Sequence, residues 1–418
     1  MLMLSKRSVV FLVVSAAAFS QSAIAKQSQA WSWCKSKDRP AISTDLSISG
    51  CTTVIQSGSE TQNKLAIAFN YRGQAYHDKG DYERAIKDYD QAIRLNPDYA
   101  EAFNDRGNTY REMGDYNRAI QDYDHAIHLK LDYAQAFGNR AIAYYLMGNY
   151  GRAFQDFNLA IRFKPNFAQA YYNRGKAYYS AFGDSDRAIR DLDQAIRLNP
   201  NFAQAFNNRG IAYHDKGDYD RAIKDYDQAI RLKPNYALAF INRGVTYHDK
   251  GDYERAIKDY DQTIQLKPKY VQAYINRGTT YKDKGDYDRA IQDYDHAIQL
   301  KPNNAKAYSA RCWLRAESNK SLEAGLADCN KSLQLNSRDA NTLVGRGFIY
   351  YRMKRYKDSI RDCNASLEHH SKAADPLYIR GLAKHRLHQQ SAGDADIAAS
   401  KKLNPKIVHE YEHFGIKP

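Results

Sequence analysis

A pattern of about 34 residues recurs along most of this chain of 418 residues, and the period restricts the folds that are open to it. Each copy is centred on a small residue, which is glycine in most copies. These centres are Gly73, Gly107, Ala141, Gly175, Gly210, Gly244, Gly278, Cys312, Gly347 and Gly381. A period of this length is typical of repeat proteins, in which each unit buries its apolar face against its neighbours.

Each copy is predicted to form two short amphipathic helices joined by a Gly-Asp turn, and most copies end at a Lys-Pro or Asn-Pro break. In the first copy, Gly73, Ala85 and Ala92 are small enough for the paired helices to approach closely, and Tyr76 and Tyr89 would fill the space around them. The chain contains 34 tyrosines, and this aromatic content argues against disorder.

The helix-turn-helix period, with its spacing of small and aromatic residues, resembles the tetratricopeptide repeat family. The resemblance covers residues 66–405 in ten units and implies an all-α fold, a right-handed α-solenoid with a long concave groove. The last three units depart most from the pattern, which fits capping of the solenoid end. We expect residues 26–65 to form an N-terminal cap segment with a helix over 45–56, and residues 406–418 a C-terminal capping helix.

The N-terminus has the layout of a bacterial secretory signal peptide. Lys6 and Arg7 precede an apolar run over 9–19, and a small-residue site for signal peptidase ends at Ala25. Cleavage there would remove residues 1–25, leave Lys26 as the first residue and lower the net charge from +14 to +12. The run is too short for a permanent span. We expect export to the periplasm; retention as an interfacial anchor stays open.

Cysteine placement agrees with an oxidising compartment. Cys34 and Cys51 precede the repeats, and a disulfide between them would fix the N-terminal cap. Cys312 and Cys329 lie on the two predicted helices of one unit and form a second candidate pair, while Cys363 is expected to be a buried small residue. The absence of a C-x-x-C motif argues against a zinc ribbon or a thioredoxin-like site.

Two charged columns run through all ten repeats. Since an unpaired buried charge is costly, we predict a structural row of Arg–Asp ion pairs, within a repeat or between neighbours. An anion-binding arginine track is the alternative. The arginines are Arg72, Arg106, Arg140, Arg174, Arg209, Arg243, Arg277, Arg311, Arg346 and Arg380. The aspartates are Asp88, Asp122, Asp156, Asp191, Asp225, Asp259, Asp293, Asp328, Asp362 and Asp396.

A row of amides marks the predicted peptide groove. A side-chain amide offers donors and acceptors, so a row of them can hold an extended peptide without reading its sequence. The row resembles the asparagine ladder of the O-linked N-acetylglucosamine transferase repeats; bracing of the neighbouring arginines is the alternative. It consists of Asn139, Asn173, Asn208, Asn242 and Asn276. Nearby, one position of the first helix holds His77, Tyr145, Tyr179, His214 and His248. These five side chains would either stack on ligand groups or be solvated.

One motif is typical of catalysis. His409-Glu410-Tyr411-Glu412-His413 satisfies the H-E-x-x-H pattern of zinc proteases, but a catalytic zinc needs a third protein ligand, and five residues follow His413. We therefore expect no enzymatic activity, no cofactor and no metal, with a zinc-dependent hydrolase as the remote alternative.

The expected function is that of an interaction scaffold or adaptor of the bacterial cell envelope, which binds an extended peptide or a partner protein in the concave groove. The alternative is an assembly factor that binds an anionic cell-wall polysaccharide or exopolysaccharide, because the chain is basic. Export argues against a nucleic-acid partner, and no stable membrane span is expected after signal cleavage. The partner, the pathway and the oligomeric state do not follow from the residues.

Overall fold

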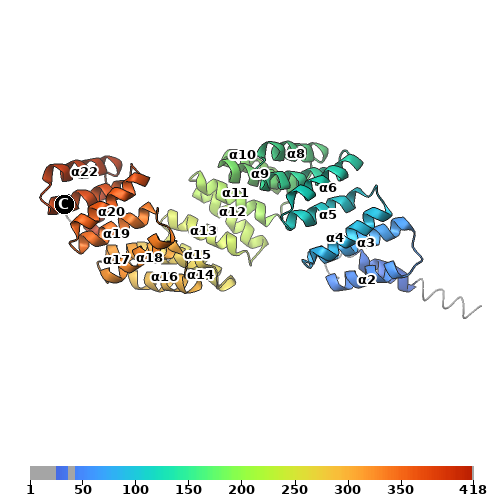
Figure 1. Cartoon of the computed structure of the whole chain (residues 1–418), viewed down its shortest axis with the longest axis horizontal. Coiled ribbons are helices and arrows are strands. Elements are labelled where there is room, and N and C mark those ends of the chain that lie inside the picture. Colours follow the sequence, from blue (N-terminus) through green and yellow to red (C-terminus); the bar gives the residue numbers. More distant parts are fainter. Residues whose placement is uncertain (1–24, 36–42, 417–418) are drawn as a thin grey trace, which may run out of the picture. The chain divides into compact units, whose positions relative to one another are not determined.

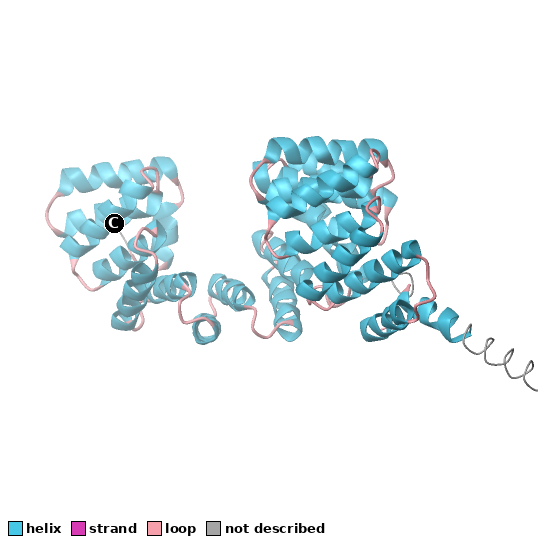
Figure 2. Ribbon diagram, turned by 45° about the vertical axis from the view of Figure 1, so that its right-hand side comes forward, coloured by secondary structure: helices cyan, strands magenta, loops and turns pink. Residues whose placement is uncertain are grey.

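The computed structural model describes residues 25–35 and 43–416, and these ranges contain helices and turns without a strand (Figure 2). The predicted signal peptide, apart from Ala25, lies outside the described residues. The fold is an all-α solenoid of helix pairs (Figure 1). It divides into two compact units, residues 1–201 and 202–418, which are described separately below. No helix among the described residues has the length and apolar character needed to cross a bilayer.

Unit 1 contains four complete helix pairs preceded by a shorter helical segment. Residues 25–34 are helical and pack against α2. The helices are α2 (Thr44–Gln56), α3 (Gln62–Asp78), α4 (Tyr82–Leu95), α5 (Ala100–Glu112), α6 (Tyr116–Leu129), α7 (Ala134–Leu146), α8 (Tyr150–Phe163), α9 (Ala168–Phe182) and α10 (Ser185–Leu198).

Unit 2 continues the same arrangement with six pairs and a short last helix. Its helices are α11 (Ala203–Asp215), α12 (Tyr219–Leu232), α13 (Ala237–Asp249), α14 (Tyr253–Leu266), α15 (Val271–Asp283), α16 (Tyr287–Leu300), α17 (Ala305–Ser318), α18 (Leu322–Leu335), α19 (Ala340–Arg352), α20 (Tyr356–His369), α21 (Ala374–Arg386), α22 (Gln390–Leu403) and α23 (Ile407–His413).

The turn inside each pair follows from its Gly-Asp dipeptide. In the repeat formed by α13 and α14, Gly251 has a φ of 83°, which favours glycine, and Asp252 is the N-cap of α14. The Asp252 carboxylate accepts a hydrogen bond from the backbone N–H of Arg255 at 3.1 Å. The dipeptide therefore ends one helix and starts the next within a few residues.

Close packing within each pair depends on the small residue at the centre of the repeat. A Cβ atom added to Gly244 on α13 would lie 2.7 Å from Cε1 of Tyr260, a ring from α14 that is 1% exposed. The same glycine-to-tyrosine contact is present at Gly73 and Tyr89. The alternation of small and aromatic residues thus sets the distance between the paired helices.

The repeat array begins with a capped helix and ends with a short helix that packs on the last repeats. The first repeat helix, α3, begins at Gln62 rather than near residue 66, because Thr61 caps it and accepts a hydrogen bond from the Lys64 N–H. At the other end, α23 buries Ile407 and Tyr411 in the apolar core of unit 2. The last helix therefore covers apolar surface at the end of the tenth repeat.

Candidate functional site

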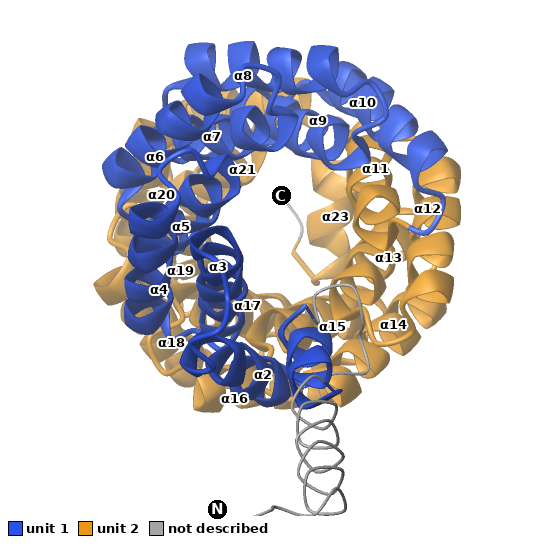
Figure 3. Cartoon of the chain, turned by 90° about the vertical axis from the view of Figure 1, so that its right-hand side faces the viewer, with its two compact units in different colours: residues 1–201 blue, residues 202–418 orange. Residues whose placement is uncertain are grey.

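The first helix of each pair lies on the inner side of its unit, and the second helix lies on the outer side (Figure 3). In unit 1 the inner helices are α3, α5, α7 and α9. In unit 2 they are α11, α13, α15, α17, α19 and α21. The predicted groove residues all belong to inner helices, whereas the paired aspartates belong to outer helices.

The Arg–Asp pairs are present within all ten repeats. In each, the arginine donates through Nε and Nη2 to the two carboxylate oxygens of the aspartate, as Arg72 does to Asp88 at 2.7 and 2.8 Å. These hydrogen bonds raise the pKa of Arg72. The paired side chains are mostly buried, with exposed fractions of 18% and 7%. Matched carboxylates neutralise the row, so the alternative of an anion-binding arginine track receives no support.

A second contact of these arginines was not predicted. The remaining Nη1 group donates to the preceding repeat, as Arg106 does to Asp90 at 2.6 Å and Arg174 to Asn158 at 2.6 Å. The signal was present, because an Asp or Asn stands two residues after the buried Asp in most repeats. Each such guanidinium therefore joins both helices of its own repeat to the outer helix before it.

The asparagine row is half-buried on the inner helices, where its amides contact other amides. Asn139 donates to Asn104 at 2.9 Å, and Asn242 donates to Asn207 at 3.0 Å, in each case across neighbouring inner helices. Asn173 accepts a hydrogen bond from Gln169. Asn276 and Asn208 likewise accept from Gln272 and Asn207. The arginine guanidinium groups donate instead to side chains on the outer helices. These amide hydrogen bonds therefore do not hold the arginines in place, which was the alternative interpretation of the row.

Residues of the aromatic and histidine column contact the neighbouring inner helix or a tyrosine five residues on, and both contacts occur in both units. In unit 2, His214 contacts Asp249 and His248 contacts Asp283, each through Nε2 at 2.9 Å and each across neighbouring inner helices. The hydrogen bond that His248 donates to the Asp283 carboxylate raises the pKa of His248. In unit 1, Tyr145 packs on Tyr150 with ring centroids 5.4 Å apart.

Two predicted groove residues, Tyr145 and Asn173, meet in one pocket of about 270 Å³ on the inner side of unit 1. It spans three successive inner helices, α5, α7 and α9. Its wall is apolar, and its rim carries polar and cationic groups. The lining residues are Arg111, Glu112, Ile142, Tyr145, Leu146, Phe157, Asn173, Lys176 and Ala177. The pocket can therefore take an apolar side chain while its rim hydrogen-bonds to a backbone.

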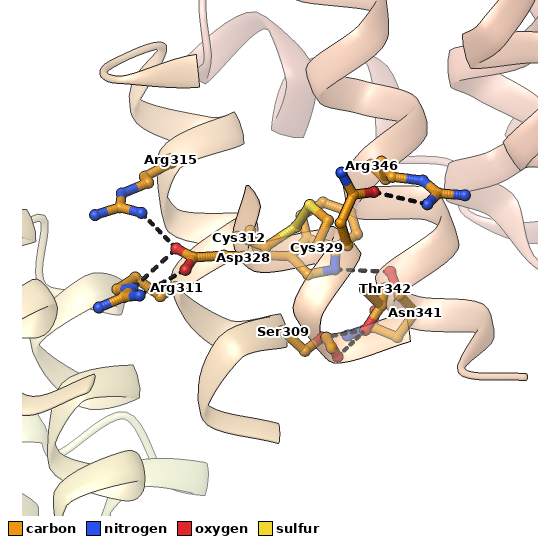
Figure 4. The surroundings of a disulfide bond; sticks show 12 residues. Ser309, Arg311, Cys312, Arg315, Asp328, Cys329, Asn341, Thr342 and Arg346 are labelled. Atoms are coloured by element: carbon orange, nitrogen blue, oxygen red, sulfur yellow. Dashed lines mark hydrogen bonds and ion pairs between the residues drawn. A yellow bond between two sulfur atoms is a disulfide. The ribbon is translucent and has the colours of Figure 1, made fainter. Parts of the chain in front are cut away.

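Both predicted cysteine pairs are disulfides, Cys34–Cys51 and Cys312–Cys329, and Cys363 is free and buried. Figure 4 shows that the second disulfide joins α17 to α18 beside Asp328, whose carboxylate contacts Arg311 and Arg315. The Cys34–Cys51 disulfide joins the helical segment 25–34 to α2. These bonds fix helix pairs at the start and in the later part of the array.

The H-E-x-x-H residues lie on α23, where Tyr411 is buried and the His409 side chain is 90% exposed. In the described part of the chain no three His, Cys, Asp or Glu side chains are grouped so that they could hold a metal ion. Among the described residues, none groups with this motif to supply the third ligand that a catalytic zinc requires.

Family models match the region that contains these sites. A TPR repeat model matches residues 73–110, 107–148, 143–181, 183–217, 212–251 and 244–283, and a tetratricopeptide repeat model matches 271–304. The chain belongs to the tetratricopeptide repeat family. Proteins of this family bind protein or peptide partners, the fold is generally a non-enzymatic scaffold, and no catalytic family is indicated.

Solved structures share the fold at low sequence identity. A tetratricopeptide repeat protein from Parabacteroides merdae is 19% identical, with a TM-score of 0.50 over 59% of this chain and 97% of its own. The APC/C hetero-tetramer Cut9–Hcn1 is 13% identical, with a TM-score of 0.51 over 89% of this chain and 92% of its own. No curated protein matches the sequence.

Proposed function

We propose that this protein is an adaptor that binds an extended segment of a partner protein at the inner-side pocket of unit 1. The observation that supports the proposal is the convergence of Tyr145 and Asn173 in that pocket. The pocket is of side-chain size, and its apolar wall would take one large apolar side chain of the partner.

The surroundings of the pocket favour an extended ligand. Leu146 lines the pocket and is 49% exposed, and Met147 beside it is 48% exposed. Other repeats carry Asp-Lys at these two positions, for example Asp215-Lys216. Exposed apolar residues of this kind mark interaction surfaces, so a bound segment would continue from the pocket over this edge of unit 1.

The rim of the pocket would hold the ligand backbone. The side-chain oxygen of Asn173 accepts a hydrogen bond from Gln169. The side-chain N–H groups of Asn173 can therefore donate to a peptide carbonyl. Lys176 on the same helix would favour an acidic residue next to the apolar one.

Selection of peptides from a random displayed library on the purified protein tests this function. Peptides retained by the native protein should bind Tyr145→Ala and Asn173→Ala variants at least about ten-fold more weakly. Asn276→Ala makes the same change on α15 of unit 2 and should bind normally. Selected peptides that bind all variants equally would refute the assignment of the pocket, and enrichment of none would favour the polysaccharide alternative.

The proposed place of action is the bacterial cell envelope. The N-terminal pattern of Lys6, Arg7 and the Ala25 site supports export, and the two disulfides fit an oxidising compartment. Expression in a bacterial host followed by fractionation and N-terminal sequencing tests this proposal. A periplasmic product beginning at Lys26 is expected, whereas a cytoplasmic product that keeps residues 1–25 would contradict it.

A further inference from the structure

Two pockets of about 290 and 380 Å³ in unit 2 are both lined by Trp313. Three residues line both pockets: Trp313 on α17, Asn341 on α19 and Asp375 on α21. They come from three successive inner helices, so the two pockets share one wall. Neither pocket contains a residue of the predicted asparagine row.

Trp313 is held in a fixed position. Its indole Nε1 donates to the backbone carbonyl of Asn341 at 2.9 Å, and its ring contacts Phe348 with centroids 6.4 Å apart. The corresponding position of other repeats holds a smaller side chain, such as Ile211, Val245 or Thr279. A half-buried tryptophan with a satisfied N–H therefore presents its ring to the pockets without a loss of freedom on binding.

The charge around this ring is negative. Glu317 pairs with Lys282 at 3.3 Å, but Lys282 also contacts Asp283 at 3.3 Å, so one ammonium serves two carboxylates. Asp375 accepts a hydrogen bond from the Tyr411 hydroxyl at 2.9 Å and forms no ion pair with a described residue. Burial raises the pKa of Asp375, and burial together with the nearby Asp375 raises the pKa of Glu317. Carboxylates outnumber lysine and arginine side chains in both linings: Glu317 and Asp375 accompany Lys282 in the smaller pocket, and Asp339 and Asp375 accompany Arg338 in the larger.

We propose that this site binds a lysine side chain of a partner protein, with the aliphatic stem along Trp313 and the ammonium group at Asp375. The faces of aromatic rings attract cations, and tryptophan attracts them most strongly. A lysine stem covers apolar surface while its ammonium stays at a polar group, and each pocket is large enough to admit one such side chain. The site lies in unit 2 and does not depend on the unit 1 pocket.

The experiment uses the native protein with ¹⁵N-labelled tryptophan indoles. The chain has three tryptophans, so the Trp31 and Trp33 signals serve as internal controls for Trp313. The probe is the acetylated and amidated peptide Gly-Gly-Lys-Gly-Gly. We expect a saturable shift of the Trp313 signal alone. No shift, or an equal shift with the ε-acetyl-lysine form of the peptide, would overturn the proposal.

Two further arms separate the alternatives. A peptide with a free N-terminus and no lysine carries an ammonium group without a stem; binding equal to that of the lysine peptide would overturn the lysine assignment. Asp375→Asn keeps an acceptor for Tyr411 but removes the charge, and should weaken binding by about ten-fold or more. Asp288→Asn removes an exposed charge at the start of α16 and should change nothing. Equal affinities of the two variants would refute the role of Asp375.

Discussion

Arg243 holds both carboxylate oxygens of Asp259, through Nε at 2.8 Å and Nη2 at 2.6 Å, while its Nη1 donates to Asp227 of the preceding repeat. One guanidinium therefore closes the helix pair α13–α14 and joins it to α12. Since the planar donor fork of arginine fits this geometry, lysine could not replace it. The same arrangement at Arg277 and Arg311 makes the row a structural feature of unit 2.

Replacement of Arg243 by alanine should destabilise unit 2 strongly. The buried Asp259 would lose its partner, and removal of one member of a buried pair costs about 3–5 kcal/mol. Arg255→Ala is the matched control, because Arg255 pairs with Asp252 on the surface. Urea unfolding should show a large loss for Arg243→Ala and none for Arg255→Ala; equal losses would contradict the structural role.

Substitution of glycine by alanine should have opposite effects at two positions. At Gly244 the new Cβ would lie 2.7 Å from the Tyr260 ring, so the helices must separate, at a cost of about 1–3 kcal/mol. At Gly151, in the first turn of α8, no atom lies within 4 Å, and alanine should stabilise by up to about 1 kcal/mol. Thermal unfolding of both variants measures the difference, and a neutral Gly244→Ala would refute the packing argument.

Loss of the Cys312–Cys329 disulfide should loosen α17 and α18 locally. The bond closes a loop with a sequence separation of 17, for which a stabilisation of about 3 kcal/mol is expected. Hydrogen exchange measured on the Cys312→Ala/Cys329→Ala variant should be faster in these two helices and unchanged in α5 and α6 of unit 1. Unchanged exchange in α17 and α18 would show that packing alone holds this repeat.

The stability of unit 2 should depend on the ionisation of His248. Asp283 raises the pKa of His248 above the unfolded value of about 6.5. This contribution to stability is therefore complete below about pH 6.5 and is lost as the pH rises through the folded pKa. The difference in unfolding free energy between native protein and H248Q should be larger at pH 6 than at pH 8.5. A difference independent of pH would mean that Asp283 does not shift the pKa of His248 in the fold.

The sequence alone determined the fold class and the helix pairs, because these depend on contacts within one repeat. Gly244 and Tyr260 show the reason: their separation in sequence repeats in most units, so the period itself carries the information. The predicted disulfides have the same local origin. The arginine and aspartate columns predicted ion pairs but left open whether each pair lies within a repeat or between neighbours. The second arginine contact, such as Arg106 with Asp90, depended on the register between neighbouring repeats, which the period left open.

Only the tertiary structure decided which side chains meet on the inner sides of the units. Tyr145 and Asn173 come from different repeats, and Trp313 and Asp375 come from helices separated by a whole repeat. Trp313 and Asp375 break their columns, so no periodic signal marked them. The sequence determines each helix pair through local packing, whereas a binding site on the inner side arises from the stacking of successive pairs, which brings together residues with no regular spacing.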